Sequence, residues 1–112
     1  MLLSTLTSHL AGIYGDAEAI RIIKEAGFDA YDFSAFQMFH QADYALNGPQ
    51  YREYAARLRA TADDCGIVCN QSHAPFASSV GEAVRDEEIF EAIVRAMETA
   101  SILGAKIIVV HP

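Results

Sequence analysis

The chain has 112 residues, enough for one domain, and 52% of them are hydrophobic against 21% that are charged. That balance excludes a disordered chain and predicts a packed core. The formal net charge of −7, with no basic cluster, disfavours nucleic acid as a partner, because an acidic protein repels a phosphate backbone.

The first predicted elements are a strand over residues 2–6 and a helix over residues 16–26. Asp16 suits the N-cap of this helix. Gly27 suits the position just after it, where a left-handed backbone is needed. The strand-like run GFDAYDFS starts at that glycine. The unit is therefore a helix that ends at a glycine and leads directly into a strand.

The same unit recurs twice. A second helix is predicted from Pro49, which suits a first helical position, to Gly66, and it leads into the strand IVCNQSH. A third is predicted from a cap at Asp86 to Gly104, and it leads into the strand KIIVVHP. The core-facing side of the third helix is predicted to hold Ile89, Ile93, Met97 and Ala100. The glycines fall 39 and 38 residues apart.

Four strands that alternate with three helices, with no run of hairpins, predict an α/β fold with a parallel sheet and right-handed crossovers. The N-terminal half of a parallel (β/α)₈ barrel and a small open doubly wound sheet both fit this order. The chain closes on an apolar strand that no helix covers. We therefore expect residues 1–112 to be a single domain, the N-terminal portion of a truncated (β/α)₈ barrel.

Polar residues stand at the carboxyl ends of three predicted strands, where parallel α/β folds carry their sites. Strict alternation predicts three sets of residues on shared faces: Phe28, Ala30 and Asp32; Ile67, Cys69, Gln71 and His73; Ile107, Val109 and His111. Asp32, His73 and His111 would then lie side by side. Imidazole is a common ligand for zinc, manganese and iron, and a carboxylate completes many such sites.

Other histidines and the aromatic residues after the second strand carry less weight. His9 and His40 fall in predicted loops and are expected at the surface. A second predicted loop holds Phe33, Phe36, Met38 and Phe39. Core packing is the favoured role of these four, with a substrate wall or a partner surface as the alternative.

The two cysteines, Cys65 and Cys69, match no common zinc spacing and are predicted to be small core residues. They form no disulfide framework, and no apolar run is long enough to cross a bilayer. We therefore expect a cytoplasmic protein with no membrane contact. The sequence also contains no nucleotide-binding glycine motif and no hydrolase serine elbow.

Three segments together resemble a known family. GFDAYDFS, SHAPF and LGAKIIVVHP, at the second, third and fourth strands, are similar to the xylose-isomerase-like TIM barrel superfamily. This superfamily contains sugar-phosphate isomerases and epimerases as well as endonuclease IV-type enzymes. The resemblance implies that the chain corresponds to the first four barrel strands, with His73 and His111 as metal- or substrate-site histidines. Asp32 falls where many members have a glutamate.

The resemblance implies a metal-dependent sugar or sugar-phosphate isomerase or epimerase that moves a proton through an enediolate. A divalent metal, Zn²⁺, Mn²⁺ or Mg²⁺, would be held in the full-length protein with His73 and His111 among its ligands. Asp32 and His73 would bind the sugar. The proton-transferring residues would lie on the later strands, so no catalytic residue is expected in this half of the site.

Two other functions are compatible with the same residues. A catalytically incomplete half-barrel would pair through its open strand edges and serve as a homodimeric binding module. An endonuclease IV-like phosphodiesterase would use the same histidines on abasic DNA, although the acidic balance of the chain argues against it.

Overall fold

The computed structural model describes all 112 residues, which form a four-stranded parallel sheet with helices packed against it. The strands are β1 (Ser4–Leu6), β2 (Ala30–Ser34), β3 (Val68–His73) and β4 (Ile108–Val109). Their order in the sheet is β1-β2-β3-β4, so each strand pairs with its neighbours along the chain. This parallel, sequential order confirms the predicted α/β class and is the order of a barrel wall.

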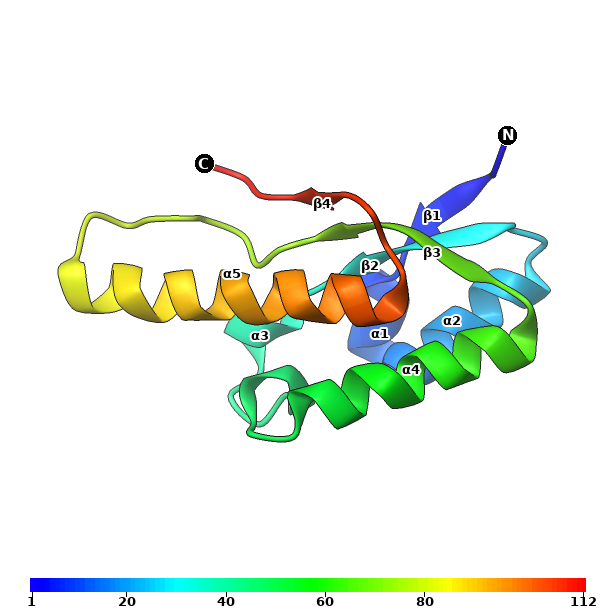
Figure 1. Ribbon diagram of the computed structural model, residues 1–112, viewed down its shortest axis with the longest axis horizontal. Coiled ribbons are helices and arrows are strands. Elements are labelled where there is room, and N and C mark those ends of the chain that lie inside the picture. The colour runs from blue at the N-terminus through cyan, green and yellow to red at the C-terminus, as the bar shows by residue number, and fades with distance from the viewer.

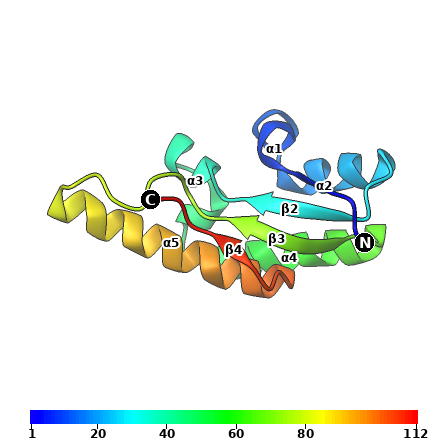
Figure 2. The ribbon, with the colours of Figure 1, turned by 90° about the horizontal axis from the view of Figure 1, so that it is seen from above.

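Five α-helices and one 3₁₀-helix connect the strands. They are α1 (Ser8–Tyr14), α2 (Asp16–Glu25), α3 (Gln37–His40), η1 (Ala45–Asn47), α4 (Tyr51–Cys65) and α5 (Ala83–Leu103). The helices lie on one side of the sheet (Figure 1), and the strands run side by side when seen from above (Figure 2). No helix combines the length and the hydrophobicity that a membrane crossing requires.

The three predicted helices exist, but their first residues differ from the prediction. Asp16 is the first residue of α2 rather than its cap, because its buried side chain turns instead toward Tyr44 and Tyr54. Pro49 precedes α4, which begins at Tyr51. Asp86 lies inside the first turn of α5, which begins at Ala83. Helix ends depend on local side-chain partners that a periodic pattern does not reveal.

Two short helices replace predicted loops. His9 lies in α1 and His40 ends α3, and both side chains are exposed, as expected for surface residues. Phe33 belongs to β2, while Met38 and Phe39 belong to α3, so the predicted aromatic loop is wrong as local structure. Helices of seven and four residues are too short to show a clear apolar period.

The core lies between the sheet and the helices. Tyr31 and Phe33 of β2 are fully buried there, among side chains of α2, α4 and α5. On α5 the buried side holds Ile89, Ala92, Ala96, Thr99, Ala100 and Leu103. Met97 was predicted to face the core, but it is 50% exposed. The small residues Ala92, Ala96 and Ala100 carry the buried side of α5 in its place, and such residues permit close packing against the sheet.

Candidate functional site

A β-bulge in β3 decides which side chains reach the open face of the sheet. Tyr31 of β2 pairs with Cys69, but the next residue, Asp32, pairs with Gln71, so Asn70 is the extra residue. Ile67 and Cys69 therefore pack into the core beneath the helices, whereas Gln71 and His73 meet Asp32. The prediction that all four residues share one face is wrong, because it assumed a regular strand. Bulges of this kind re-aim side chains and are frequent near active sites.

Asp32 and His73 form a close pair at the carboxyl ends of β2 and β3. His73 Nδ1 lies 2.9 Å from Asp32 Oδ1, and both side chains are mostly shielded from solvent. Gln71 Nε2 donates to the other oxygen, Asp32 Oδ2, at 2.6 Å. Both oxygens of the carboxylate are thus engaged by β3. Strand alternation predicts that Gln71 and His73 share a face, but it does not predict the hydrogen bond from Gln71 to Asp32.

His111 lies next to His73 but is held differently. The two rings are nearly parallel, with 5.6 Å between centroids and an interplanar angle of 18°. The ring centroid of Phe76, in the segment after β3, lies 5.0 Å from that of His111. The ring centroid of Phe36 lies 6.0 Å from that of His73. The two phenylalanines also meet edge to face. The structure therefore brings Asp32, His73 and His111 together, as predicted, and adds an aromatic wall of Phe36 and Phe76.

The residues of the predicted aromatic segment divide between the core and the polar cluster. Phe33 and Met38 are buried in the core, and Phe39 packs against it. Phe36 instead lies edge to face with the ring of His73. Phe76 is 61% exposed although it is large and apolar. Its ring packs beside those of His111 and Phe36, so it lies at the edge of the polar cluster.

The residues of this chain do not complete a metal site. No group of three His, Cys, Asp or Glu side chains is placed to hold an ion. A protein zinc site usually has three or four such ligands. The contact between His73 and Asp32 does fit a metal-binding histidine. Such histidines commonly hydrogen-bond a carboxylate through the ring nitrogen that does not bind the metal, and His73 Nδ1 contacts Asp32 in this way. His73 and His111 are thus two donors of a larger set at most.

Cys69 lies on β3 but in the core, on the opposite side of the sheet from Asp32 and His73. Its side chain is buried, and this burial raises the pKa of the thiol to about 11. A thiol of that pKa stays protonated at neutral pH and does not attack a substrate. Cys69 lies in the core and Cys65 packs against it, and both are free thiols. The predicted core position is confirmed for Cys69, whereas Cys65 is half-buried at the edge of the core.

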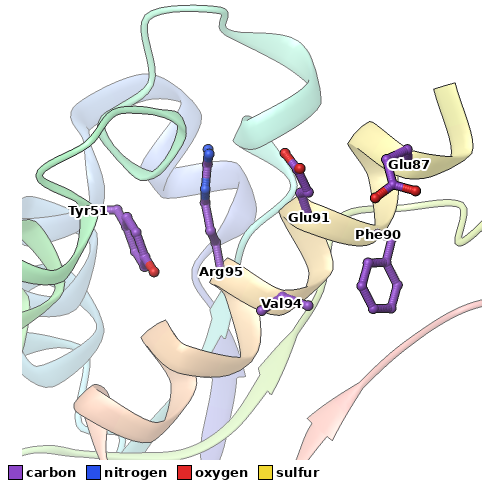
Figure 3. Close-up of a pocket in the computed structure, with 6 residues that line it drawn as sticks. All are labelled: Tyr51, Glu87, Phe90, Glu91, Val94 and Arg95. Atoms are coloured by element: carbon purple, nitrogen blue, oxygen red, sulfur yellow. The ribbon is translucent and has the colours of Figure 1, made fainter. Parts of the chain in front are cut away.

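The largest surface hollow lies elsewhere, between α4 and α5. It has a volume of about 440 Å³, and Figure 3 shows Tyr51, Glu91 and Arg95 among its lining residues. Tyr51 already donates its hydroxyl proton to Glu98, and Arg95 donates to the backbone oxygen of Asn47. These polar groups are satisfied within the fold. The hollow therefore offers less free chemistry than the ends of β2, β3 and β4.

Comparison with known proteins identifies the family of this chain. The family model described as the xylose isomerase-like TIM barrel matches residues 20–112. Among curated protein sequences, none matches the chain.

Solved structures share the fold at low identity. One is the 3-keto-D-glucoside 4-epimerase YcjR from E. coli (TM-score 0.60, 18% identity, 85% of this chain and 32% of that chain). Another is a D-psicose 3-epimerase solved in the presence of D-fructose (TM-score 0.64, 19% identity, 98% of this chain and 37% of that chain). A third is a fusion of a xylose isomerase-like TIM barrel with a 4-hydroxyphenylpyruvate dioxygenase (TM-score 0.61, 20% identity, 98% of this chain and 16% of that chain).

This chain spans about a third of the length of the two epimerases. Its sequential parallel sheet, with polar residues gathered at the carboxyl ends of the strands, is consistent with the N-terminal part of such a barrel. With the family match covering residues 20–112, the chain belongs to the xylose isomerase-like TIM barrel family.

Proposed function

We propose that the protein containing this chain is a metal-dependent sugar isomerase or epimerase, and that residues 1–112 supply the first half of its site. The observation that carries the proposal is the Asp32–His73 pair with His111 beside it, at the carboxyl ends of three adjacent strands. Family membership and the two epimerases of similar fold support the same reaction class. We also propose that the 112 residues are one N-terminal portion of a single barrel domain.

In this proposal, the residues of the chain bind and orient the sugar. Asp32 keeps the proton of His73 on Nδ1, so that Nε2 offers a lone pair to a sugar hydroxyl or to the ion. Phe36 and Phe76 wall the site with apolar rings and reduce the access of water to the sugar. The groups that move the proton between carbons would come from later strands of the barrel.

A divalent ion, when bound, would supply Lewis-acid stabilisation of the enediolate charge. His73 and His111 are the two side chains of this chain that would hold it, and Zn²⁺, Mn²⁺ and Mg²⁺ are the proposed candidates. Sugars and sugar phosphates are the proposed partners. The cytoplasmic location stays a prediction.

Deuterium exchange tests the proposal in the full-length protein. A panel of ketoses and their phosphates is incubated in D₂O with Mn²⁺, Zn²⁺ or Mg²⁺, and proton NMR follows label entering the carbon next to the carbonyl. We expect exchange that His73→Ala lowers by at least about 100-fold, the scale of a lost acid–base or ligand group. The matched control is His9→Ala, which removes an exposed histidine of α1. Absence of exchange with every sugar and metal would contradict the proposal.

A half-barrel that pairs through its open strand edges as a homodimeric binding module is the second candidate. Apolar side chains beside both edge strands support it: Leu2 and Leu3 before β1, and Ile107 before β4, are all more than half exposed. Sedimentation of the 112-residue chain over a range of concentrations tests this candidate. A dimer that Ile107→Asp dissociates, with no metal and no isomerase activity, would favour it. No contact in the structure specifically favours the endonuclease IV-like phosphodiesterase, which stays a prediction.

A further inference from the structure

Gln71 is the one member of the polar cluster whose role no sequence motif assigns. Its Nε2 reaches Asp32 Oδ2 at 2.6 Å, while His73 Nδ1 reaches Oδ1 at 2.9 Å. Two side chains of β3 thus hold the two oxygens of one carboxylate on β2. The bulge at Asn70 makes this possible, because it brings Gln71 directly opposite Asp32 in the strand pairing.

The direction of both hydrogen bonds follows from the chemistry of the groups. A carboxylate accepts hydrogen bonds, so Gln71 must present its amide nitrogen and His73 must carry a proton on Nδ1. A neutral imidazole with a proton on Nδ1 keeps its lone pair on Nε2. His73 Nε2 makes no hydrogen bond within the chain. It is also not one of the buried polar atoms that lack a partner. The lone pair is therefore available to a ligand.

We infer that Gln71 is a positioning residue that fixes the tautomer of His73 through Asp32. The amide of Gln71 holds Oδ2, which leaves Oδ1 aimed at His73 Nδ1 and prevents the carboxylate from turning away. That the ligand of Nε2 is a sugar or its metal rests on the proposed function. The tautomer itself is a property of these 112 residues and is measured without either.

A merely structural role for Gln71 makes a different prediction. If Gln71 only fills space in the sheet, an apolar side chain of the same length would leave the proton of His73 on Nδ1. If Gln71 positions Asp32, the same substitution lets the carboxylate rotate, and the imidazole returns to the mixture of tautomers that a free histidine shows. The substitution Gln71→Met separates the two roles.

Nitrogen NMR of the chain labelled with ¹⁵N-histidine reads the tautomer directly, at a pH where imidazole is neutral and with no sugar or metal present. His73→Ala assigns the His73 signals. We expect wild type to show a protonated Nδ1 and an unprotonated Nε2, and Gln71→Met to lose this single state. Gln41→Met is the matched control, because the Gln41 side chain bonds only to Gln37 at the surface. It should leave the His73 signals unchanged.

A second variant keeps the test decisive if Gln71→Met fails to fold, which the backbone amide spectrum reveals. Gln71→Glu keeps the size and polarity of the side chain but cannot donate to Asp32 and repels it, so it should also lose the single tautomer. Asp32→Asn should move the proton to Nε2, because an amide offers its own N–H to Nδ1. Folded Gln71 variants that keep the proton on Nδ1 would overturn the inference.

The full-length protein gives an independent readout. A positioning role should lower kcat of Gln71→Met by roughly 10- to 100-fold, the usual cost of losing a supporting hydrogen bond behind a histidine ligand, with KM little changed. A fall in sugar affinity at unchanged kcat would instead make Gln71 a direct sugar contact and overturn the inference. If the protein shows no isomerase activity, the proposed function fails, while the NMR result still decides the role of Gln71.

Discussion

The two faces of the sheet differ in what they bury and in what they leave free. On the helix-covered face, Tyr31 and Phe33 are wholly buried in the core. On the open face, the neighbouring residue of the same strand is Asp32, which carries the polar network with Gln71 and His73. Two successive residues of β2 thus serve opposite purposes. The covered face stabilises the fold, and the carboxyl end of the open face holds the polar network of the proposed site.

Truncation of Phe33 should give the largest loss of stability. Phe33→Ala empties a fully buried position, and changes of this kind lower the free energy of unfolding by about 3–5 kcal/mol. The control is Val68→Ala at an exposed position of β3, where the change should stay within about 0.5 kcal/mol. Urea unfolding followed by circular dichroism measures both. Equal losses would remove the distinction between the two sides of the sheet.

Truncation of Asp32 should cost less stability. Asp32→Ala leaves the amide of Gln71 and Nδ1 of His73 without their shared acceptor, which lowers the free energy of unfolding by about 1–3 kcal/mol. Asp43→Ala, at an exposed aspartate, is the matched control. The same urea titration measures the difference. A loss as large as that of Phe33→Ala would mean that the open face is part of the stabilising core.

Asp16 is the polar exception on the helix side, and it makes stability depend on pH. Burial raises the pKa of its carboxyl above the ordinary aspartate value of 3.8, although hydrogen bonds from Tyr44 and Tyr54 partly oppose this rise. A raised pKa in the folded state means that the protonated form is favoured by folding. Its contribution to stability is therefore present below pH 3.8 and is lost as the pH rises through the folded-state pKa.

The substitution Asp16→Asn should remove this dependence. The difference in urea midpoint between wild type and Asp16→Asn should favour wild type more in acid than at neutral pH. Asp63→Asn, at an exposed aspartate of α4, should leave the pH profile as it is in wild type. If wild type and Asp16→Asn follow the same pH profile, the buried carboxyl does not titrate with folding.

The smallest effect is expected in the loop that presents Phe76. Asp86 accepts hydrogen bonds from the Val80 backbone N–H at 2.6 Å and from Ser79 Oγ at 2.9 Å, and these bonds lower the pKa of its carboxyl. Because the pKa of Asp86 is lower in the folded state, these bonds are fully formed above pH 3.8. They weaken as the pH falls through the folded-state pKa, which lies below 3.8. Asp86→Asn should speed hydrogen exchange at the Val80 amide and leave the urea midpoint unchanged. A shifted midpoint would tie this loop to the core.

Much of the fold followed from patterns that are local in the sequence. Gly66 and Gly104, predicted to end helices, adopt φ values of +74° and +91°, where glycine is strongly favoured. The strand-end positions of Asp32, His73 and His111 followed from the parallel order of the strands. The roles of Gln71 and Met97 did not, because they depend on a bulge and on close helix packing. Both arise from contacts between segments that are distant in the chain.

The order of the strands also bears on how the protein is made. Because each of these four strands pairs with the one synthesised before it, no pairing within these 112 residues waits for a later part of the chain. Chains generally fold from the N-terminus during synthesis, at about 5–20 residues per second. A ribosome-bound intermediate can therefore add one strand–helix unit at a time, and all three residues of the Asp32–Gln71–His73 network are present once β3 has emerged.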